Sequence, residues 1–417
     1  MSIRTPQAGV PWEDPASLRH YGRLKPGPSQ PRPDVIASQR ARLQRAIVEL
    51  AARDGLDAVT VRRLTKLAGV STATFYSRFS GTDDCLLTTY EEIMASAARS
   101  IVDARSPDLG PAEQLDRALR VLLARLLADR DVARFVLIEI YGGGPAAISA
   151  IGDKEGELAA ALRGCVDRRG RRIPKVAVAA IIAAVLHCAR AELIDAAPEE
   201  ASTLIDALVE WATDVVEGRD EVGIPTAAAR RASPLDPSWA PGGSASAGRD
   251  ERGLIEAAIL QLALPDGFRA LDPGKVSSAS GLPAACFRRH FGTLADGYLA
   301  AIRRTSGSFF AELTAQTDPA ASARTSIRAA LHKASRRAAS DPAAAHLTFR
   351  QVIEPGVAGL TCRETLISEL ALACTDGPGA APSMRVRAEA RVAALWEALA
   401  QGAQATAGRR PRAATAD

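Results

Sequence analysis

Apolar residues recur at helical spacing along most of the chain. Residues 40–53 place Leu43, Ile47 and Leu50 on one face, at spacings of four and three, with arginines around them. The leucines of residues 112–128 repeat in the same way. Both segments are predicted to be amphipathic helices that pack on a core. The pattern as a whole predicts an all-α fold.

Segments that are poor in large apolar residues divide the chain into two helical blocks. Residues 1–36 are rich in proline, and we expect them and residues 401–417 to be disordered. Residues 218–250 combine Pro, Gly, Ala and Ser without a helical period, which predicts a flexible linker. A chain of 417 residues exceeds one ordinary core, so two or more domains are expected.

The second block repeats the first at a constant shift of 212 positions. Phe75 falls on Phe287 and Gly69 on Gly281, without a gap from residue 40 to residue 87. Matches between alanines arise easily by chance in this alanine-rich chain, whereas matches between glycines and between phenylalanines do not. We interpret the pattern as a tandem duplication of one unit.

The stretch AGVSTATFYSRF has the layout of a tight turn followed by a short helix. Gly69 is expected to make the turn, and Ser71 to cap a helix over residues 72–79. Phe75 and Phe79 are four residues apart on that helix and should both face inward. The opposite face carries small polar residues and a tyrosine, which are left outside.

The helices before this turn complete the predicted motif. A glycine at position 55 should end the first helix in a left-handed cap. Thr60 should then cap a short helix that buries Val61, Leu64 and Leu67. Two short helices joined in this way form a helix-turn-helix, whose second helix can enter the DNA major groove.

The predicted motif carries more positive charge than the whole chain. Residues 40–79 hold eight Lys and Arg against three Asp and Glu, a net charge of +5, whereas the whole chain has +4. Small side chains suit close approach to base edges, and a tyrosine can reach a phosphate. The alternative is a helical packing unit whose arginines are only solvated. The candidate DNA contacts are Thr60, Arg62, Arg63, Lys66, Ser71, Thr72, Ala73, Thr74, Tyr76, Ser77 and Arg78.

These residues resemble a known family. The stretch TVRRLTKLAGVSTATFYSRF at 60–79, followed by DDCLL at 83–87, is similar to the N-terminal domain of TetR-family transcriptional regulators. The resemblance implies a three-helix DNA-binding head on a larger helical body that binds a small molecule and dimerises. Two heads would then sit in successive major grooves of a palindromic operator in double-stranded DNA. The family usually has a lysine where this chain has Thr82, so that phosphate contact is not carried over.

The resemblance and the repeat together predict four folded parts. The first head is expected at residues 37–98, and the first body, which binds ligand and dimerises, at residues 99–217. A second and divergent head is expected at residues 251–310, and a second body at residues 311–400.

The second copy keeps the apolar anchors of the motif and changes its surface. Tyr76 is replaced by Arg288, and residues 252–291 have a net charge of only +2. Asp272 and Pro273 should still cap its second helix. A solvated helix end is the alternative to DNA binding by this copy. Its possible DNA contacts are Lys275, Arg288, Arg289 and His290.

Two architectures are consistent with a duplication. The copies could pack on each other as a pseudo-dimer within one chain, or whole chains could form a homodimer whose second copies are accessories. The 33-residue linker spans roughly 30 Å, and tethering favours the pseudo-dimer. Against full symmetry, the first copy ends in two predicted helices, at 174–196 and 199–217, and the second in one, at 383–400.

On the resemblance, the first body binds a small, apolar effector, and His187 and Arg190 are the candidate pocket residues. A histidine packed in the core or in an interface is the alternative for His187. The expected function is a ligand-responsive repressor whose affinity for DNA falls when the effector binds. A protein-interaction module that has lost DNA binding is the competing class.

Other chemistries find no support in the residue pattern. No nucleophile elbow, HExxH motif or paired carboxylates with a histidine occur, so neither an enzyme nor a cofactor is expected. Six cysteines form no CxxC pair, and no metal site is expected. The stretch YGGGP at 141–145 is expected to break a helix. The apolar run at 176–188 is too short to span a bilayer, and a cytoplasmic protein without membrane contact is predicted.

Overall fold

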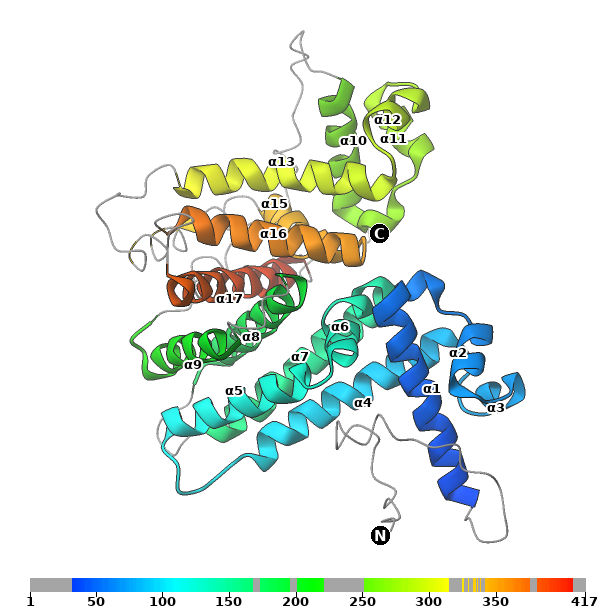
Figure 1. Cartoon of the computed structure of the whole chain (residues 1–417). Coiled ribbons are helices and arrows are strands. Elements are labelled where there is room, and N and C mark those ends of the chain that lie inside the picture. Colours follow the sequence, from blue (N-terminus) through cyan, green and yellow to red (C-terminus); the bar gives the residue numbers. More distant parts are fainter. Residues whose placement is uncertain are drawn as a thin grey trace, which may run out of the picture. The chain divides into compact units, whose positions relative to one another are not determined.

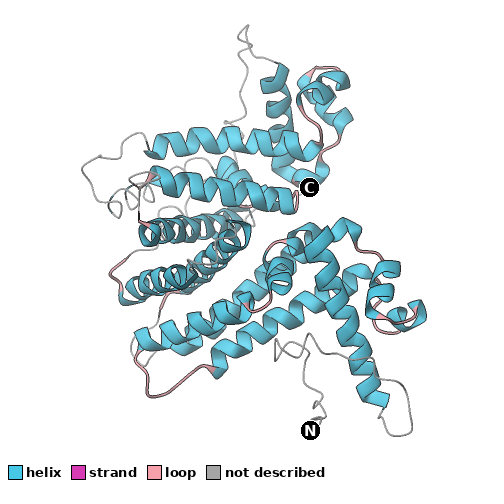
Figure 2. Cartoon of the chain, viewed as in Figure 1, coloured by secondary structure: helices cyan, strands magenta, loops and turns pink. Residues whose placement is uncertain are grey.

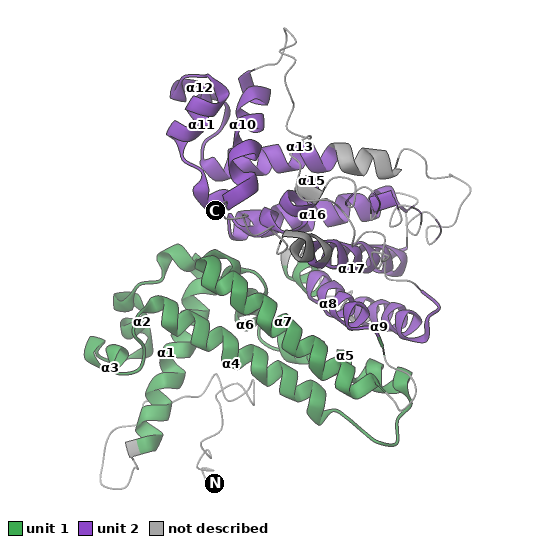
Figure 3. Ribbon diagram, turned by 180° about the vertical axis from the view of Figure 1, so that it is seen from behind, with its two compact units in different colours: residues 1–173, 189–198 green, residues 174–188, 199–417 purple. Residues whose placement is uncertain are grey.

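The computed structural model confirms the predicted all-α fold, because every element that it describes is a helix (Figures 1 and 2). It describes single residues between 325 and 338 and six longer stretches, which are residues 32–167, 173–195, 201–220, 251–314, 342–375 and 381–407. The predicted N-terminal segment and linker lie almost entirely outside these stretches. The chain forms two compact units (Figure 3), residues 1–173 with 189–198 and residues 174–188 with 199–417.

The first unit runs from a long first helix through a helix-turn-helix into a helical body. The first helix begins at Arg32, before residue 40 where the predicted helix starts and before residue 37 where the head was predicted to start. The elements of this unit are α1 (Arg32–Asp54), η2 (Leu56–Ala58), α2 (Val61–Ala68), α3 (Thr72–Tyr76), α4 (Thr82–Asp103), α5 (Pro111–Leu127), α6 (Arg130–Leu137), η3 (Glu139–Gly143) and α7 (Gly144–Val166).

The body of the first unit is built on α4, which packs against α5 and α7. The four leucines that α5 aligns on one face are all buried, which confirms the predicted amphipathic helix. Gly144, the first residue of α7, has φ 76°. Because a residue with a Cβ is strained at such an angle, this glycine lets the chain break the helix, as the sequence predicted.

The second unit combines the end of the first predicted body with all described residues of the second half. It takes residues 174–188 and 199–217 from the body predicted at 99–217. Its elements are most of α8 (Lys175–Asp195), then α9 (Ala201–Glu217), α10 (Glu251–Asp266), η7 (Phe268–Ala270), α11 (Pro273–Ser280), α12 (Ala284–His290), α13 (Leu294–Thr314), α15 (Pro342–Phe349), η8 (Gln351–Ile353), α16 (Val357–Ala373) and α17 (Pro382–Ala407).

The core of the second unit lies around its last helix. α17 packs against α9, α15 and α16, and Figures 1 and 3 show α8 and α9 beside it. Trp211 of α9 and Trp396 of α17 are both buried. The ring of Trp396 meets that of Phe349 edge-on, with centroids 4.9 Å apart. This aromatic contact fills space between α15 and α17.

Helix α8 is both long and strongly apolar. Residues Lys175–Leu193 have the length and composition of a membrane span, but 78% of that window is buried inside the protein. This degree of burial is that of a core helix.

Candidate nucleic-acid interface

Two side-chain caps and one glycine build the turn of the first helix-turn-helix. The Thr60 hydroxyl accepts a hydrogen bond from the Arg63 amide at 3.3 Å, and the Ser71 hydroxyl accepts one from the Thr74 amide at 3.1 Å. Both predicted caps are therefore confirmed. Gly69 ends α2 in the left-handed region, with φ 62° and ψ 39°. Since glycine adopts these angles without strain, the local sequence determines the turn.

Two phenylalanines anchor α3 from the inside, as predicted. Phe75 is fully buried and Phe79 nearly so, with ring centroids 5.9 Å apart. The guanidinium of Arg40 lies over the Phe79 ring, 5.2 Å from its centroid. Tyr76 points outward and is 58% exposed. The helix itself ends at Tyr76 rather than at residue 79, although the Phe79 amide still donates to the Phe75 carbonyl at 2.9 Å.

Further local predictions for this head are wrong. Leu67 is 42% exposed rather than buried, and Val61 is only half-buried. The inward face of α2 consists instead of Leu64, Thr65 and Ala68, and the Thr65 hydroxyl is bonded within the helix. Gly55 has a positive φ of 78°, but its ψ of 166° is extended rather than left-handed helical.

Most of the predicted DNA contacts reach solvent. Arg63, Thr74 and Arg78 are half-buried. The others are exposed, and they are Thr60, Arg62, Lys66, Ser71, Thr72, Ala73, Tyr76 and Ser77. The small side chains of α3 and the cations of α2 are thus accessible to a nucleic acid.

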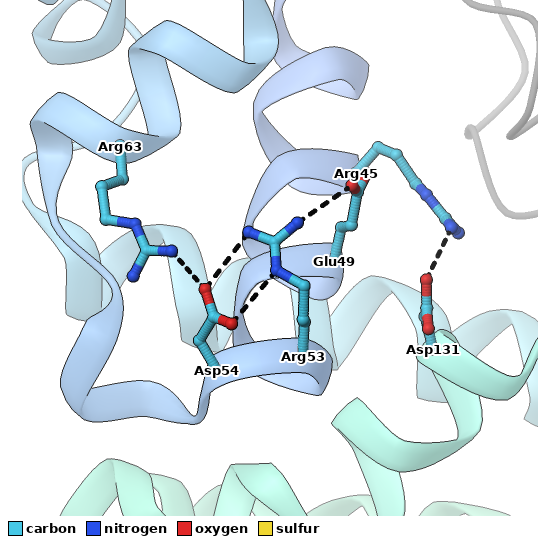
Figure 4. Close-up of polar contacts among 6 residues, drawn as sticks. All are labelled: Arg45, Glu49, Arg53, Asp54, Arg63 and Asp131. Carbon is cyan, nitrogen blue, oxygen red and sulfur yellow. Dashed lines mark hydrogen bonds and ion pairs between the residues drawn. The ribbon is translucent and has the colours of Figure 1, made fainter.

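The half-buried Arg63 belongs to an ion-pair network at the end of α1 (Figure 4). It pairs with Asp54, whose other oxygen accepts from Arg53 at 3.1 Å. Hydrogen bonds from Arg53 and then Arg63 hold the pKa of Asp54 below its usual value. Arg53 also lies 3.7 Å from Glu49. Arg63 is therefore held against the end of α1, whereas Arg62 extends into solvent.

A second ion pair joins the head to the body of the first unit. Arg45 of α1 lies 2.7 Å from Asp129 and 3.1 Å from Asp131, and Figure 4 shows the second of these contacts. Asp129 is buried and also caps α6 by accepting from the Asp131 amide. Because Asp129 is held by its capping bonds and little exposed, this pair is screened less than a surface pair.

Asp84 fastens the loop after α3 to the start of α4. Its carboxylate accepts from the Ser80 amide at 2.7 Å, the Ser80 hydroxyl at 3.1 Å and the Thr88 hydroxyl at 3.2 Å. Ser80 immediately precedes Gly81, the N-cap of α4, so the carboxylate ties the incoming chain to the first turn of the helix. The hydrogen bonds, first that of the Ser80 amide, hold the pKa of Asp84 below its usual value.

We expect Asp84→Ala to lower the free energy of unfolding by about 1 kcal/mol at neutral pH. Since the pKa of Asp84 is lowered in the folded state, its contribution is present above the pKa of the unfolded chain, about 4, and is lost as the pH falls through the lower folded value. Urea melts of wild type and variant between neutral pH and about pH 3 measure this. A stability difference that stays constant over that range would contradict the assignment.

The second unit contains a comparable series of elements at the shift of 212. After this shift η7 has the bounds of η2, α11 those of α2, and α15 those of α6. Three pairs of glycines with positive φ also correspond. Gly55 and Gly267 both have φ 78°, Gly69 and Gly281 have φ 62° and 70°, and Gly144 and Gly356 have φ 76° and 74°.

The interior of the second head matches that of the first. Phe287 and Phe291 have ring centroids 5.6 Å apart, and Arg252 lies over the Phe291 ring at 5.2 Å. Asp272 caps α11 by accepting from the Gly274 amide at 2.8 Å, which confirms the predicted cap.

The surface of the second head is different, because Glu251 holds two of its predicted DNA contacts. One oxygen of Glu251 lies 2.8 Å from Arg289 and 3.1 Å from His290. The hydrogen bond from His290 is the first cause that lowers the pKa of Glu251. Lys275 donates to the Ala270 carbonyl at 3.2 Å, and Arg288 is exposed.

The equivalent position in the first head carries an uncharged residue. There Gln39 accepts from Arg78 at 3.3 Å. Residue 251 could have been found from the sequence, because it lies 212 positions after Gln39 and changes an amide to a carboxylate.

The two predicted pocket residues fall in different units. Arg190 belongs to the first unit, where it is buried with its guanidinium 6.0 Å from the centroid of the Tyr141 ring. His187 belongs to the second unit, where it is buried and bonded to Glu364. No pattern in the sequence pointed to Glu364. Among the described residues, no three His, Cys, Asp or Glu side chains have the arrangement of a metal site.

Comparison with known proteins gives one family match and several structural neighbours. Residues 43–89 match the profile described as bacterial regulatory proteins, tetR family. No curated protein matches the chain.

Three solved structures of regulators are similar to part of the chain. FadR from Bacillus subtilis, in complex with stearoyl-CoA, is 17% identical, with 42% of this chain and 96% of that chain covered and a TM-score of 0.36. FadR from Bacillus halodurans is 18% identical, with 47% and 97% covered and a TM-score of 0.36. PfmR from Thermus thermophilus is 23% identical, with 42% and 94% covered and a TM-score of 0.31. With the caps, the buried phenylalanines and the exposed face described above, the family match identifies residues 43–89 as a TetR-family N-terminal DNA-binding domain.

Proposed function

We propose that the chain is a DNA-binding transcriptional regulator in which two TetR-like copies form a single-chain pseudo-dimer. The observation that carries the DNA-binding part is the first head. It has the family's turn, a buried pair of phenylalanines and an outward face of small polar residues with Tyr76, Arg62 and Lys66. Such a face fits the edges of base pairs and the phosphates beside them.

The matched elements of the two halves support the duplication. Helix bounds and glycine angles agree after one constant shift, without an insertion from η2 to α6. α8 and α17 also end at corresponding residues, Asp195 and Ala407. Unrelated helical domains have no reason to share one register over so long a stretch.

The composition of the second unit supports the pseudo-dimer. It unites α8 and α9 of the first copy with α16 and α17 of the second copy. Ion pairs connect them, since Arg387 of α17 pairs with Glu210 of α9, and Arg391 lies 2.7 Å from Asp220. Two chains of an ordinary dimer would make such contacts between subunits, and here one chain makes them with itself.

The heads of this pseudo-dimer are proposed to bind DNA unequally. The first head presents Arg62 and Lys66 on α2, where the second has Gly274 and Ser278. The second also holds cations of its recognition helix with Glu251. Since phosphate neutralisation supplies most non-specific affinity, the second head should be the weaker of the two.

We expect Glu251→Gln to raise DNA affinity several-fold at low salt and to steepen the slope of log affinity against log salt by about 1, because a carboxylate no longer competes with phosphate. Gln is the residue that the first head has at the equivalent position 39. The reciprocal variant Gln39→Glu should weaken binding by a similar factor. Fluorescence anisotropy with a labelled duplex over a salt series measures both. Unchanged affinity and slope for Glu251→Gln would show that the second head does not contact DNA.

The regulation proposed is repression relieved by a small, apolar effector. Binding of the effector in the helical body would favour a state whose heads no longer match the operator, so that affinity for DNA falls. Arg190, which is buried beside Tyr141 in the first unit, stays the proposed pocket residue, whereas for His187 the alternative of a packed histidine is the better explanation. A cytoplasmic location follows from this function.

Selection of random duplex DNA against the purified full-length chain tests the proposal. Two unlike half-sites about one helical turn apart would support a single chain that reads DNA with both heads. A perfect palindrome would instead support a homodimer whose second copies are accessories. No enrichment at low salt, where phosphate contacts are strongest, would remove DNA binding and favour the interaction module.

A further inference from the structure

A buried polar cluster joins the two copies inside the second unit. His187 of α8 is fully buried, and its Nδ1 is hydrogen-bonded to Glu364 of α16. Its Nε2 lies 3.9 Å from Glu389 of α17. Both glutamates are buried, and Arg385 contacts Glu389 at 3.3 Å. The histidine comes from the first copy and both carboxylates come from the second.

The repeat shows what each copy has at the equivalent positions. At the shift of 212, His187 corresponds to Leu399. Glu364 corresponds to Gly152, and Glu389 to Ala177. The cluster therefore has no symmetrical counterpart, although it lies between helices of two copies that share their register.

This asymmetry distinguishes the pairing of unlike copies from the pairing of like copies. Two first copies would bury His187 against Gly152 and Ala177, with no carboxylate to bond it. Two second copies would bury Glu364 and Glu389 against Leu399, so that both carboxylates would lose His187 and keep only neighbours from their own copy, such as Arg363 and Arg385. Both like pairs would lose the hydrogen bond between His187 and Glu364, and losing a partner is costly for a buried polar or charged group.

We propose that His187, Glu364 and Glu389 form a pairing code that directs the first copy to the second copy and rejects like pairs. Placing the polar partners on opposite copies favours the correct pair and penalises the wrong pairs at once, which is how specific interfaces exclude close relatives. The proposal rests on the pseudo-dimer and adds the residues that choose its partner.

Not every contact between the copies can distinguish unlike pairs from like pairs. Arg387 pairs with Glu210, but its counterpart in the first copy is Lys175, which keeps the positive charge. A pair of two first copies could therefore retain that attraction. Glu210 is also 62% exposed, so the pair is worth little. Glu210→Gln is thus a matched control that removes a contact between copies without touching the code.

The test uses the full-length chain with a protease site inserted in residues 221–250. The folded protein is cleaved, and native mass spectrometry identifies which halves stay together on dilution and on mixing with isotope-labelled protein. Wild type and Glu210→Gln should give complexes of one first and one second half only. The triple variant His187→Leu, Glu364→Ala and Glu389→Ala, which exchanges polar for small or apolar residues, should also give complexes of like halves.

The affinity of the cleaved halves gives an independent readout. His187→Leu leaves two buried carboxylates against leucine and should raise the dissociation constant of the unlike pair by roughly 100-fold or more.

A double-mutant cycle of His187→Leu with Glu364→Ala, measured by urea melts of the uncleaved chain, should show strong coupling. Additive effects, or a triple variant that still forms only unlike pairs, would overturn the pairing code. Light scattering on the uncleaved wild type separates this from the pseudo-dimer itself, because a stable dimer of whole chains would refute that arrangement directly.

Discussion

Replacing Phe75 by alanine is expected to lower the free energy of unfolding of the first head by about 3–5 kcal/mol. The side chain is fully buried, and its ring packs against Phe79 at 5.9 Å and Tyr76 at 5.3 Å. α3 has only five residues and cannot persist without tertiary contacts. Thermal and urea melts measure the loss, and DNA binding should disappear with the fold of the head.

Tyr76→Ala is the matched control, because it removes the neighbouring aromatic ring from the exposed face. Stability should fall by no more than about 1 kcal/mol, since Tyr76 is 58% exposed and loses only its edge-on contact with Phe75. Binding to the selected operator should nevertheless weaken. If Tyr76→Ala melted as early as Phe75→Ala, the assignment of inner and outer faces would be wrong.

Replacing Trp211 by alanine is expected to lower the free energy of unfolding of the second unit by about 3–5 kcal/mol. The side chain is 1% exposed and belongs to α9, which packs against α17. Its loss would leave a cavity in the core of the second unit, which the neighbouring side chains can fill only in part. Urea melts followed by circular dichroism measure the effect.

Leu372→Ala is the control for this second unit. Leu372 lies on α16 and is 42% exposed, so its truncation should change stability by less than about 0.5 kcal/mol. Trp211→Phe should fall between the two, because it keeps an aromatic ring in the core. Equal melts for Trp211→Ala and Leu372→Ala would place α9 outside the core of the unit.

The features predicted best from the sequence are those that depend on residues close together in the chain. The caps by Thr60, Ser71 and Asp272 and the turn at Gly69 follow from local hydrogen bonds and backbone angles, and all were confirmed. The burial of Phe75 follows from helical spacing in the same way.

Other features depend on contacts that spacing does not encode. Leu67 was assigned to the core because it is apolar, but the short α2 turns a bonded threonine inward in its place. The partners of His187 could not be found from the sequence, since Glu364 lies 177 positions away and on no recognisable motif. The link of Arg63 to Asp54 likewise depends on how η2 folds α2 back beside α1.

Helices from both halves of one chain share the second unit. This affects how operator occupancy depends on the number of regulator molecules in a cell. An operator-competent form made of two separate chains is depleted when their concentration falls below the dissociation constant of the dimer. A tethered pair is not subject to this dilution, because its partners stay at a fixed effective concentration. Under the proposed arrangement, operator occupancy at low expression rises with the first power of copy number, so a promoter under this control would respond to a few molecules per cell without a threshold.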